Sequence, residues 1–450
     1  MTNTVDYKKY YFIQSYFSSG QRFKINLLLF LLLLYPFIKV FTDFYFIITV
    51  DDPLFPWTVF NFLSVVGCAI AFILHQKEYS LTLILSISIA ITLLVINLFF
   101  AEMAQVKWTI NWLGFLFVFT VVAQILKSFS DAEMYVFQIR FIKVLTTIVF
   151  LLSLLTFYAL IIEPWYLDPS FLKYYIFQDR NQIHGLYRFH IGANKQHFGI
   201  FSLIVMTFVY THWSVLSKRV RAVFVTFLVI NFVAIVGVRT VILSSMVGML
   251  AFYFLKNKFR NLLAMLLASF VLLIVYIYWS EIVNVIIVLY DRFPALNFAV
   301  NAMTENVFGL GNGAYSVYVL ENNDRLLAQF GSDLMERHGH FWSAPESDVV
   351  YFIASWGILS IVFFSFLGFL VFKAVKLFHF TKALFPVEKF ILLFSVFLIF
   401  MGISEDNAGQ LTWWVFISSV FGVILRRSLL QNDPVAFHFE RLEYIKQNNE

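Results

Sequence analysis

The sequence predicts an all-α polytopic membrane protein with about 12 transmembrane helices and one large loop on the outer side. Of its 450 residues, 60% are hydrophobic and only 13% are charged, whereas soluble domains carry about 25% charged residues. The apolar runs are long and continuous, which is typical of membrane helices and not of the alternating strands of a membrane barrel. The only cysteine, Cys68, lies inside an apolar run, so no intrachain disulfide can form.

Each predicted span is an apolar stretch close to the roughly 20 residues that a helix needs to cross the hydrocarbon core. The spans are expected at 25–41, 54–75, 80–100, 108–127, 141–162, 197–216, 220–237, 239–255, 260–280, 349–372, 386–403 and 409–425. Residues 25–425 therefore form one transmembrane domain. Residues 1–24 form a polar N-terminal segment that does not resemble a cleaved signal peptide, and 426–450 form a polar tail.

Basic residues set the expected orientation, because lysine and arginine gather in cytoplasmic loops. With the N-terminus inside, the inner loops contain the runs SKRVR (217–221) and KNKFR (256–260), while outer loops such as SEDNAG (404–409) are neutral to acidic. Both termini are then cytoplasmic, and two long loops, about 163–196 and about 281–348, lie outside. The formal charge of +5 follows from the same inner loops and requires no nucleic acid partner.

Arginines on the outer side are candidate anion-binding residues. Arg239 opens a predicted span, where a charge at bilayer depth costs roughly 2.5–3.5 kcal/mol, while Arg188 and Arg292 lie in the two outer loops. Arginine binds phosphate oxygens through bidentate, charge-assisted hydrogen bonds. For Arg239 the alternative is that the side chain extends to the membrane interface, and for the loop arginines it is an ordinary surface position.

Histidines of the first outer loop do not indicate a metal site. His184, His190 and His197 show no helical i, i+4 spacing and have no carboxylate nearby. We therefore expect neither a metal nor another cofactor.

The second outer loop contains a glycine-rich turn, GLGNG. Gly309, Gly311 and Gly313 permit positive φ and a close approach of the backbone to a ligand, although alone they would indicate only a turn. No strand precedes them, so a dinucleotide-binding fingerprint is excluded.

The same loop ends in APESD, directly before a predicted span. Asp348 and Ser347 suit a helix start, since serine and aspartate cap helices and carboxylates favour a helix N-terminus. Glu346 is the stronger candidate for a general base, because apolar surroundings raise the pKa of a carboxyl group. His338 and His340 are further acid–base candidates.

Four stretches together resemble the O-antigen polymerase/ligase family of bacterial inner-membrane glycosyltransferases. The stretches are RFHIGANKQHFGIF, VGVRTVILSSMVGML, FGLGNGAYS and PESDVVYFIASWGILS. They place Arg188 with Asn194, Arg239 with Thr240, the glycine turn, and Glu346 to Asp348 before Gly357, in the order of the family's pattern. The resemblance covers about 190–360, and the five N-terminal spans match in topology only.

This resemblance implies a polytopic inner-membrane fold with a large periplasmic loop, and a metal-independent transfer of a glycan from undecaprenyl diphosphate. The ligase branch, which transfers glycan to lipid A-core, typically has a histidine–asparagine pair where this chain has Glu346 and Ser347. The polymerase branch is therefore favoured. The expected partners are an undecaprenyl-diphosphate-linked oligosaccharide, membrane lipids and a chain-length regulator protein.

The implied mechanism assigns a role to each candidate. Arg188, Arg239 and Arg292 would stabilise the leaving diphosphate, and Glu346 would deprotonate the acceptor hydroxyl, with His338 or His340 in reserve. Substrate-binding roles fall to Asn194, Gly309, Gly311, Gly313, Tyr315 and Asp348, with Tyr315 stacking on a sugar ring. A flippase is the competing class, but transporters use broken helices and midplane charges, whereas we expect spans that are clean in the middle.

Overall fold

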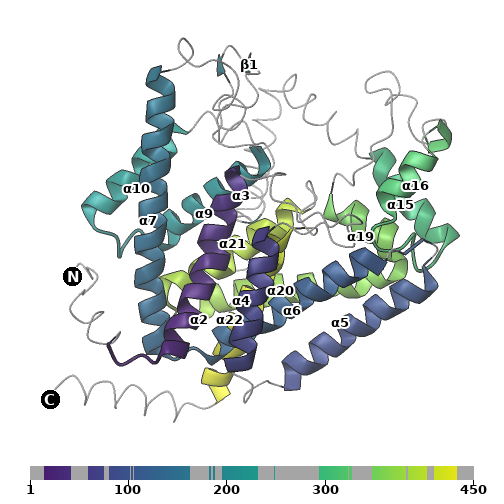
Figure 1. The fold of residues 1–450 in the computed structure, drawn as a ribbon, viewed down its shortest axis with the longest axis horizontal. Helices are drawn as coiled ribbons and strands as arrows, with labels where there is room; N and C mark the ends of the chain where they lie inside the picture. The colour runs from purple at the N-terminus through teal and green to yellow at the C-terminus, as the bar shows by residue number, and fades with distance from the viewer. Residues whose placement is uncertain are drawn as a thin grey trace, which may run out of the picture.

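The computed structural model describes residues 15–41, 59–74, 81–101, 103–104, 106–162, 182–183, 186–187, 195–231, 248, 293–322, 324–326, 347–381, 384–402 and 410–432 (Figure 1). This part of the chain is helical, apart from one short antiparallel ladder of β1 (Gln182–Ile183) and β2 (Leu186–Tyr187). The predicted all-α class is confirmed for this part of the chain.

Among the described residues no larger sheet interrupts the series of helices. In chain order they are α2 (Ser19–Leu29), the π-helix η1 (Phe30–Leu34), α3 (Tyr35–Phe41), α4 (Val59–Leu74), α5 (Leu81–Phe100), α6 (Val106–Ser128), α7 (Asp131–Ile162), α9 (Lys195–His212), α10 (Lys218–Ile230), α15 (Phe293–Glu305), α16 (Tyr315–Glu321), α19 (Asp348–Trp356), the 3₁₀-helix η2 (Gly357–Leu359), α20 (Ser360–Phe380), α21 (Pro386–Met401) and α22 (Leu411–Asn432).

Within the described residues, five helical stretches are long and apolar enough to cross a membrane. They are Ser19–Ile38, Leu83–Phe100, Trp108–Ser128, Asp131–Phe157 and Asp348–Phe380. The expected spans 239–255 and 260–280 lie outside the described residues, apart from Gly248. The total of 12 spans, the periplasmic position of the long loops and the cytoplasmic termini therefore stay predictions.

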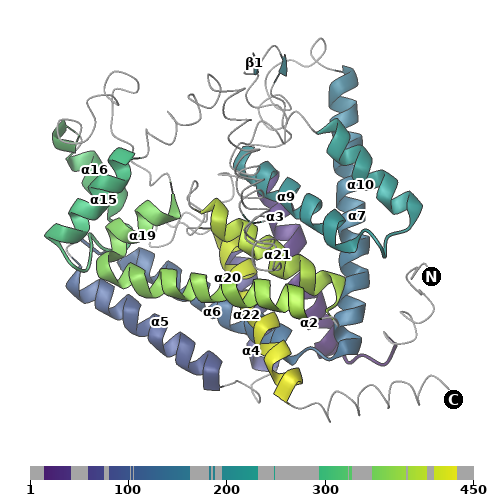
Figure 2. The same cartoon turned by 180° about the vertical axis from the view of Figure 1, so that it is seen from behind.

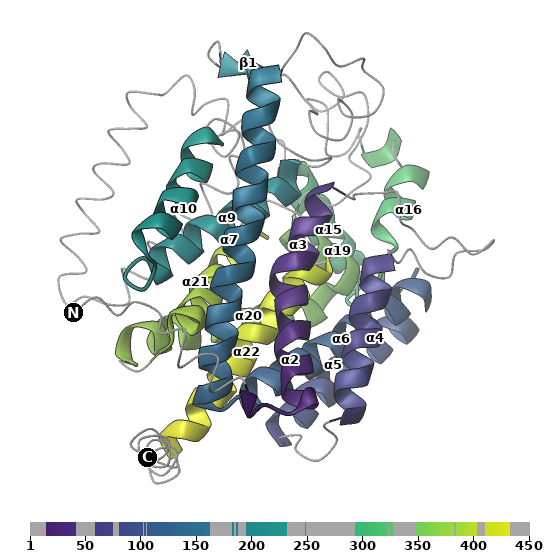
Figure 3. The same cartoon turned by 60° about the vertical axis from the view of Figure 1, so that its left-hand side comes forward.

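Helix α7 begins ten residues before the predicted span at 141–162. Glu133 Oε2 accepts hydrogen bonds from the backbone N–H and the hydroxyl of Ser130, both at 2.9 Å, and the Glu133 N–H donates to Ser130 Oγ at 3.2 Å. This reciprocal capping box starts the helix early. With 32 residues, α7 is about 48 Å long and exceeds the roughly 30 Å hydrocarbon core (Figure 3).

The first span contains a π-helical segment, η1, just before Pro36. Proline has no N–H to donate and its ring clashes with the carbonyl four residues earlier, so the helix must adjust there. The predicted span at 25–41 thus forms as one continuous helical rod with a local irregularity.

Aromatic side chains from several helices build the centre of the bundle around Trp112 of α6. Its ring lies 5.0 Å from Trp414 of α22, and 5.1 Å and 5.6 Å from Trp356 and Phe352 of α19, between ring centroids. A Cβ on Gly422 would lie 2.7 Å from the Ala123 carbonyl oxygen, so the glycine allows α22 to approach α6 closely. Helix α20 crosses this bundle (Figure 2).

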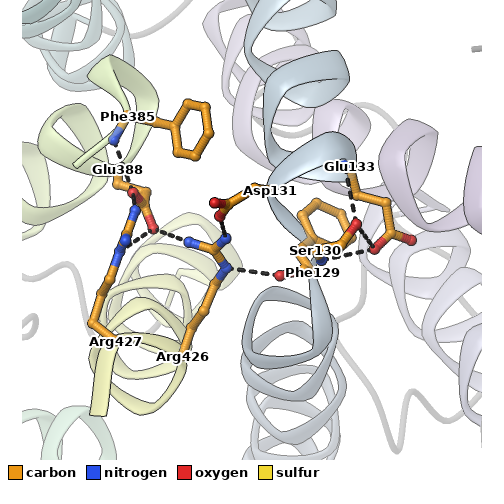
Figure 4. Close-up of polar contacts among 8 residues, drawn as sticks. All are labelled: Phe129, Ser130, Asp131, Glu133, Phe385, Glu388, Arg426 and Arg427. Atoms are coloured by element: carbon orange, nitrogen blue, oxygen red, sulfur yellow. Dashed lines mark hydrogen bonds and ion pairs between the residues drawn. The ribbon is translucent and has the colours of Figure 1, made fainter. Parts of the chain in front are cut away.

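A buried ion cluster joins the ends of α7, α21 and α22 (Figure 4). Glu388 is fully buried and accepts from Arg426 Nη1 at 2.6 Å and from Arg427 Nε at 2.9 Å, and it also pairs with Arg427 Nη2. Arg426 further donates to the Phe129 carbonyl at 2.7 Å and pairs with Asp131. Two carboxylates therefore neutralise two arginines, which allows these charges to be buried.

Candidate functional site

The span predicted at 349–372 is interrupted at Gly357, so the expectation of a span without a break is wrong here. Helix α19 ends at Trp356, Gly357 has a φ of +52°, and α20 resumes at Ser360 after one 3₁₀ turn. A Cβ at Gly357 would overlap the Val307 carbonyl oxygen and would lie 2.6 Å from the Gly309 nitrogen. The span breaks where the glycine-rich loop contacts it.

The loop supplies the hydrogen bonds that the broken helix lacks. The Leu310 N–H donates to the Ala354 carbonyl at 2.8 Å, and the Gly311 N–H donates to the Ser355 carbonyl at 3.0 Å. In return, the Ile358 N–H donates to the Val307 carbonyl at 2.8 Å. In a continuous helix the carbonyls of Ala354 and Ser355 would instead accept from the N–H groups four residues later. An irregular backbone is tolerated in a membrane span only when other protein groups satisfy it, as this loop does.

The three loop glycines adopt the predicted positive φ, with values of 77° at Gly309, 103° at Gly311 and 77° at Gly313. A Cβ at Gly309 would lie 2.7 Å from the Ala354 carbonyl oxygen, one at Gly311 would lie 2.5 Å from the Ala104 backbone, and one at Gly313 would overlap the Trp108 ring. The close approach expected for a ligand is thus made by the protein's own chain. These contacts account for the glycines without a bound substrate.

Asn97 of α5 links the loop to the broken span. Its Nδ2 donates to the Ser355 carbonyl at 2.8 Å and to the Phe308 carbonyl at 3.4 Å, while its Oδ1 accepts from the Asn312 N–H at 3.0 Å. The side chain is fully buried. Sequence reasoning missed this residue. The signal was one amide in the apolar run LLVINLFF, since polar side chains inside spans commonly hydrogen-bond across helices.

Asn312 extends the network to α19. The Tyr351 hydroxyl donates to Asn312 Oδ1 at 2.7 Å, and the Tyr351 ring lies nearly parallel to Trp112 at a centroid distance of 6.2 Å. Asn312 Nδ2 and Ser355 Oγ are buried and have no hydrogen-bond partner among the described residues. We call Asn97, Asn312, Tyr351 and Ser355 the amide node.

Asp348 and Ser347 form the start of α19, as the helix-start interpretation predicts. Ser347 Oγ accepts from the Val350 N–H at 3.2 Å, and Asp348 is the first helical residue. Asp348 is only 5% exposed, its N–H donates to the Gly402 carbonyl at 2.8 Å, and a Cβ on Gly402 would overlap its carboxylate. In this arrangement Asp348 joins α19 to the end of α21, and its role in substrate binding stays a prediction.

Tyr315 does not fit its predicted role in sugar stacking. The side chain is 1% exposed and packs edge-on against Phe298 of α15 at a centroid distance of 5.7 Å. Tyr318 stacks on the same phenylalanine at 5.7 Å. Tyr315 therefore belongs to the small core beneath the turn, formed with residues of α15 and α19.

The remaining candidates lie outside the described residues, and their roles stay predictions. They are the catalytic candidates Glu346, His338 and His340, the diphosphate-binding candidates Arg188, Arg239 and Arg292, and Asn194. Glu346 directly precedes Ser347 in the sequence, so the chain enters the capped start of α19 from it.

The described helices and this site define a helical membrane protein in which a glycine turn completes a broken span. Neither a protein-family model nor a curated protein matches this chain.

Proposed function

We propose that this chain is an O-antigen polymerase, or the polymerase of a related surface polysaccharide, in the bacterial inner membrane. It would join undecaprenyl-diphosphate-linked oligosaccharide repeat units at the periplasmic face. The carrying observation is that two of the four stretches that resemble this family, FGLGNGAYS and PESDVVYFIASWGILS, close on each other around Gly357. If the two stretches contribute to one active site, they must lie close together in the folded protein, as they do here.

The proposed chemistry places a base beside this rigid contact. A sugar hydroxyl of the acceptor must lose its proton as its oxygen attacks the anomeric carbon of the donor. Glu346 would accept that proton, an effect typically worth about 10²–10⁴-fold in rate, with His338 or His340 as the alternative base. The bond to the diphosphate breaks in the same step, and the leaving group takes its electron pair.

Arginines would stabilise the diphosphate that leaves. Arg188, Arg239 and Arg292 are all predicted on the outer side, and one well-placed donor to a developing anion is worth about 2.7–4 kcal/mol. No metal or cofactor is proposed for this transfer, since arginine fits the phosphate oxygens directly. The inner-membrane location and a chain-length regulator as partner belong to the same proposal.

The test is polymerisation of lipid-linked repeats by purified variants. We expect Glu346→Gln and Arg239→Ala to lose at least about 100-fold in rate, because each removes a group that acts on the reacting atoms. Glu321→Gln is the matched control, since Glu321 lies in the same predicted loop and is exposed at the end of α16. Near-normal polymer from Glu346→Gln or Arg239→Ala at normal protein levels would remove that residue from the mechanism.

The broken span favours a second candidate, a flippase for the same lipid-linked glycan, because transporters bind substrates at discontinuous helices. In such sites the freed backbone groups face the substrate, whereas here the loop amides occupy the carbonyls of Ala354 and Ser355. This difference favours the polymerase. Reconstitution with lipid-linked repeats separates the two, since longer glycans indicate a polymerase and translocation alone indicates a flippase. Glycan transfer to added lipid A-core would instead indicate the ligase branch.

A further inference from the structure

An apolar groove runs between α5 and the broken span, and it has no role in the proposed reaction. Its volume is about 230 Å³. The walls come from α5, α6, α19, α20 and α22, and they include Ala90, Leu93, Trp112, Trp356, Phe363 and Trp414. Among the described residues that line the groove, Ser86 is the only one that is neither aliphatic nor aromatic. A groove of this composition offers dispersion contacts and apolar burial to a hydrocarbon, but little polar recognition.

The groove is continuous with the surface that faces lipid. Ile89 lines the groove and is also 55% exposed, so it lies at the mouth. Ile91 and Val95, on the outer side of the same helix, are 41% and 46% exposed. In a candidate membrane span such exposed aliphatic side chains contact the hydrocarbon of the bilayer.

The groove follows the middle of α5. Its lining extends along that helix from Ser86 to Leu94, which corresponds to about 12 Å at 1.5 Å per residue. This is less than half of the roughly 30 Å hydrocarbon core. The groove can therefore enclose part of a chain whose remainder lies in the bilayer.

We propose that this groove holds an acyl chain of a bilayer phospholipid as a resident structural lipid. Because the described lining residues offer a ligand almost no polar contact, the occupancy of such a site follows the concentration of the competing chains. Phospholipid acyl chains form the bulk of the hydrocarbon at the mouth of the groove, so they fill it.

The resident chain supports the amide node. Asn97 lies one helical turn beyond Leu93 and Leu94 on α5, and its side chain binds the loop and the Ser355 carbonyl. Trp356, the residue after Ser355, forms part of the opposite wall. The acyl chain fills the groove between α5 and the broken span and so keeps Asn97 in contact with the turn.

The experiment is photolabelling in bilayer nanodiscs of phosphatidylethanolamine and phosphatidylglycerol, in which a small fraction of the phosphatidylethanolamine carries a diazirine on one acyl chain. Labelled peptides are mapped by mass spectrometry. Ala90→Trp fills the groove, and Ile91→Trp is the matched control, because Ile91 is the next residue but does not line it. We expect the label on groove residues of the wild type and of Ile91→Trp, with at least about tenfold less in Ala90→Trp.

Equal groove labelling in both tryptophan variants would overturn the proposal. A second result would also overturn it. If a photoreactive polyprenyl phosphate, added at the same small fraction of the lipid, labels the groove in place of the phospholipid probe, the groove selects the polyprenyl chain. If Ala90→Trp does not fold, dilution of the probe in wild-type nanodiscs decides the question. If a phospholipid acyl chain occupies the groove, labelling of the groove should fall in proportion as unlabelled phospholipid replaces the probe. Labelling that does not fall on dilution would refute the proposal.

Discussion

Removing one charge from the buried ion cluster should destabilise the protein far more than removing a charge from its surface. Glu388→Gln keeps the size of the side chain and an oxygen that can accept, but it removes the negative charge that faces Arg426 and Arg427. Arg426 retains its pair with Asp131, whereas Arg427, at 4% exposure, is left without its counter-charge from Glu388. Breaking a buried pair from one side costs about 3–5 kcal/mol.

A surface ion pair of the same chain is the matched control. Glu305 and Arg325 lie 3.9 Å apart, with side chains that are 57% and 62% exposed. Such a pair is worth about 0–1 kcal/mol, so Glu305→Gln should change stability little. The free energy of unfolding is measured by denaturant titration of both variants in the same lipid or detergent. A difference of less than about 1 kcal/mol between them would refute the charge argument.

A double variant identifies the cause of the loss. Glu388→Gln with Arg427→Gln removes one charge of each sign and leaves Arg426 with Asp131. If the loss of the Glu388 charge beside Arg427 is responsible, the double variant should be more stable than the sum of the two single losses predicts, by about 0.5–3 kcal/mol. Strict additivity would mean that packing, and not charge, is lost.

The remaining predictions concern the glycine turn and its anchor. Gly357→Ala should destabilise by more than the roughly 1–3 kcal/mol of a non-glycine residue in a sparsely populated backbone conformation, because its Cβ would also overlap the Val307 carbonyl. Gly368→Ala, in the open interior of α20, should be neutral or stabilising by up to about 1 kcal/mol. Thermal unfolding of the two variants compares them directly. Asn97→Ala should cost about 1–3 kcal/mol and speed amide hydrogen exchange in the loop, because it removes the acceptor of the buried Asn312 N–H, while the Ser355 carbonyl keeps its bond from the Gly311 N–H. Thr92→Ala, which alters an exposed hydroxyl of the same helix bonded only within α5, should leave that exchange unchanged, and equal exchange in the two variants would contradict the role of Asn97.

The length of the apolar runs predicted where most helices lie, because a chain in hydrocarbon must satisfy its backbone within each helix. Hydropathy did not predict where α7 begins. The capping box of Ser130 and Glu133 is visible in the sequence, but the helix it starts carries polar residues that a hydropathy criterion excludes. The capping box could therefore be read from the sequence, but a search for apolar runs does not take capping residues into account.

The break in the span could not be predicted from its own residues. YFIASWGILSIVFF is a continuous apolar stretch in which one glycine is commonplace for a membrane helix. What breaks it is the glycine-rich loop earlier in the chain, in which the amides of Leu310 and Gly311 reach the carbonyls of Ala354 and Ser355. The positive φ of the loop glycines could be predicted from residue type, but their contacts could not, since a glycine permits a close approach without specifying the partner.

Asn97 illustrates the same limit for the candidate site. Asn111, Gln124 and Gln138 are also buried amides in α6 and α7, so residue type alone does not single out Asn97. Its place is decided by the three backbone groups it binds, which belong to the loop and to the end of α19. Because the same loop completes the break, movement of α5 must disturb both the turn and the span that begins beside Glu346. Any chemistry carried out by Glu346 would therefore depend on an asparagine from a different helix.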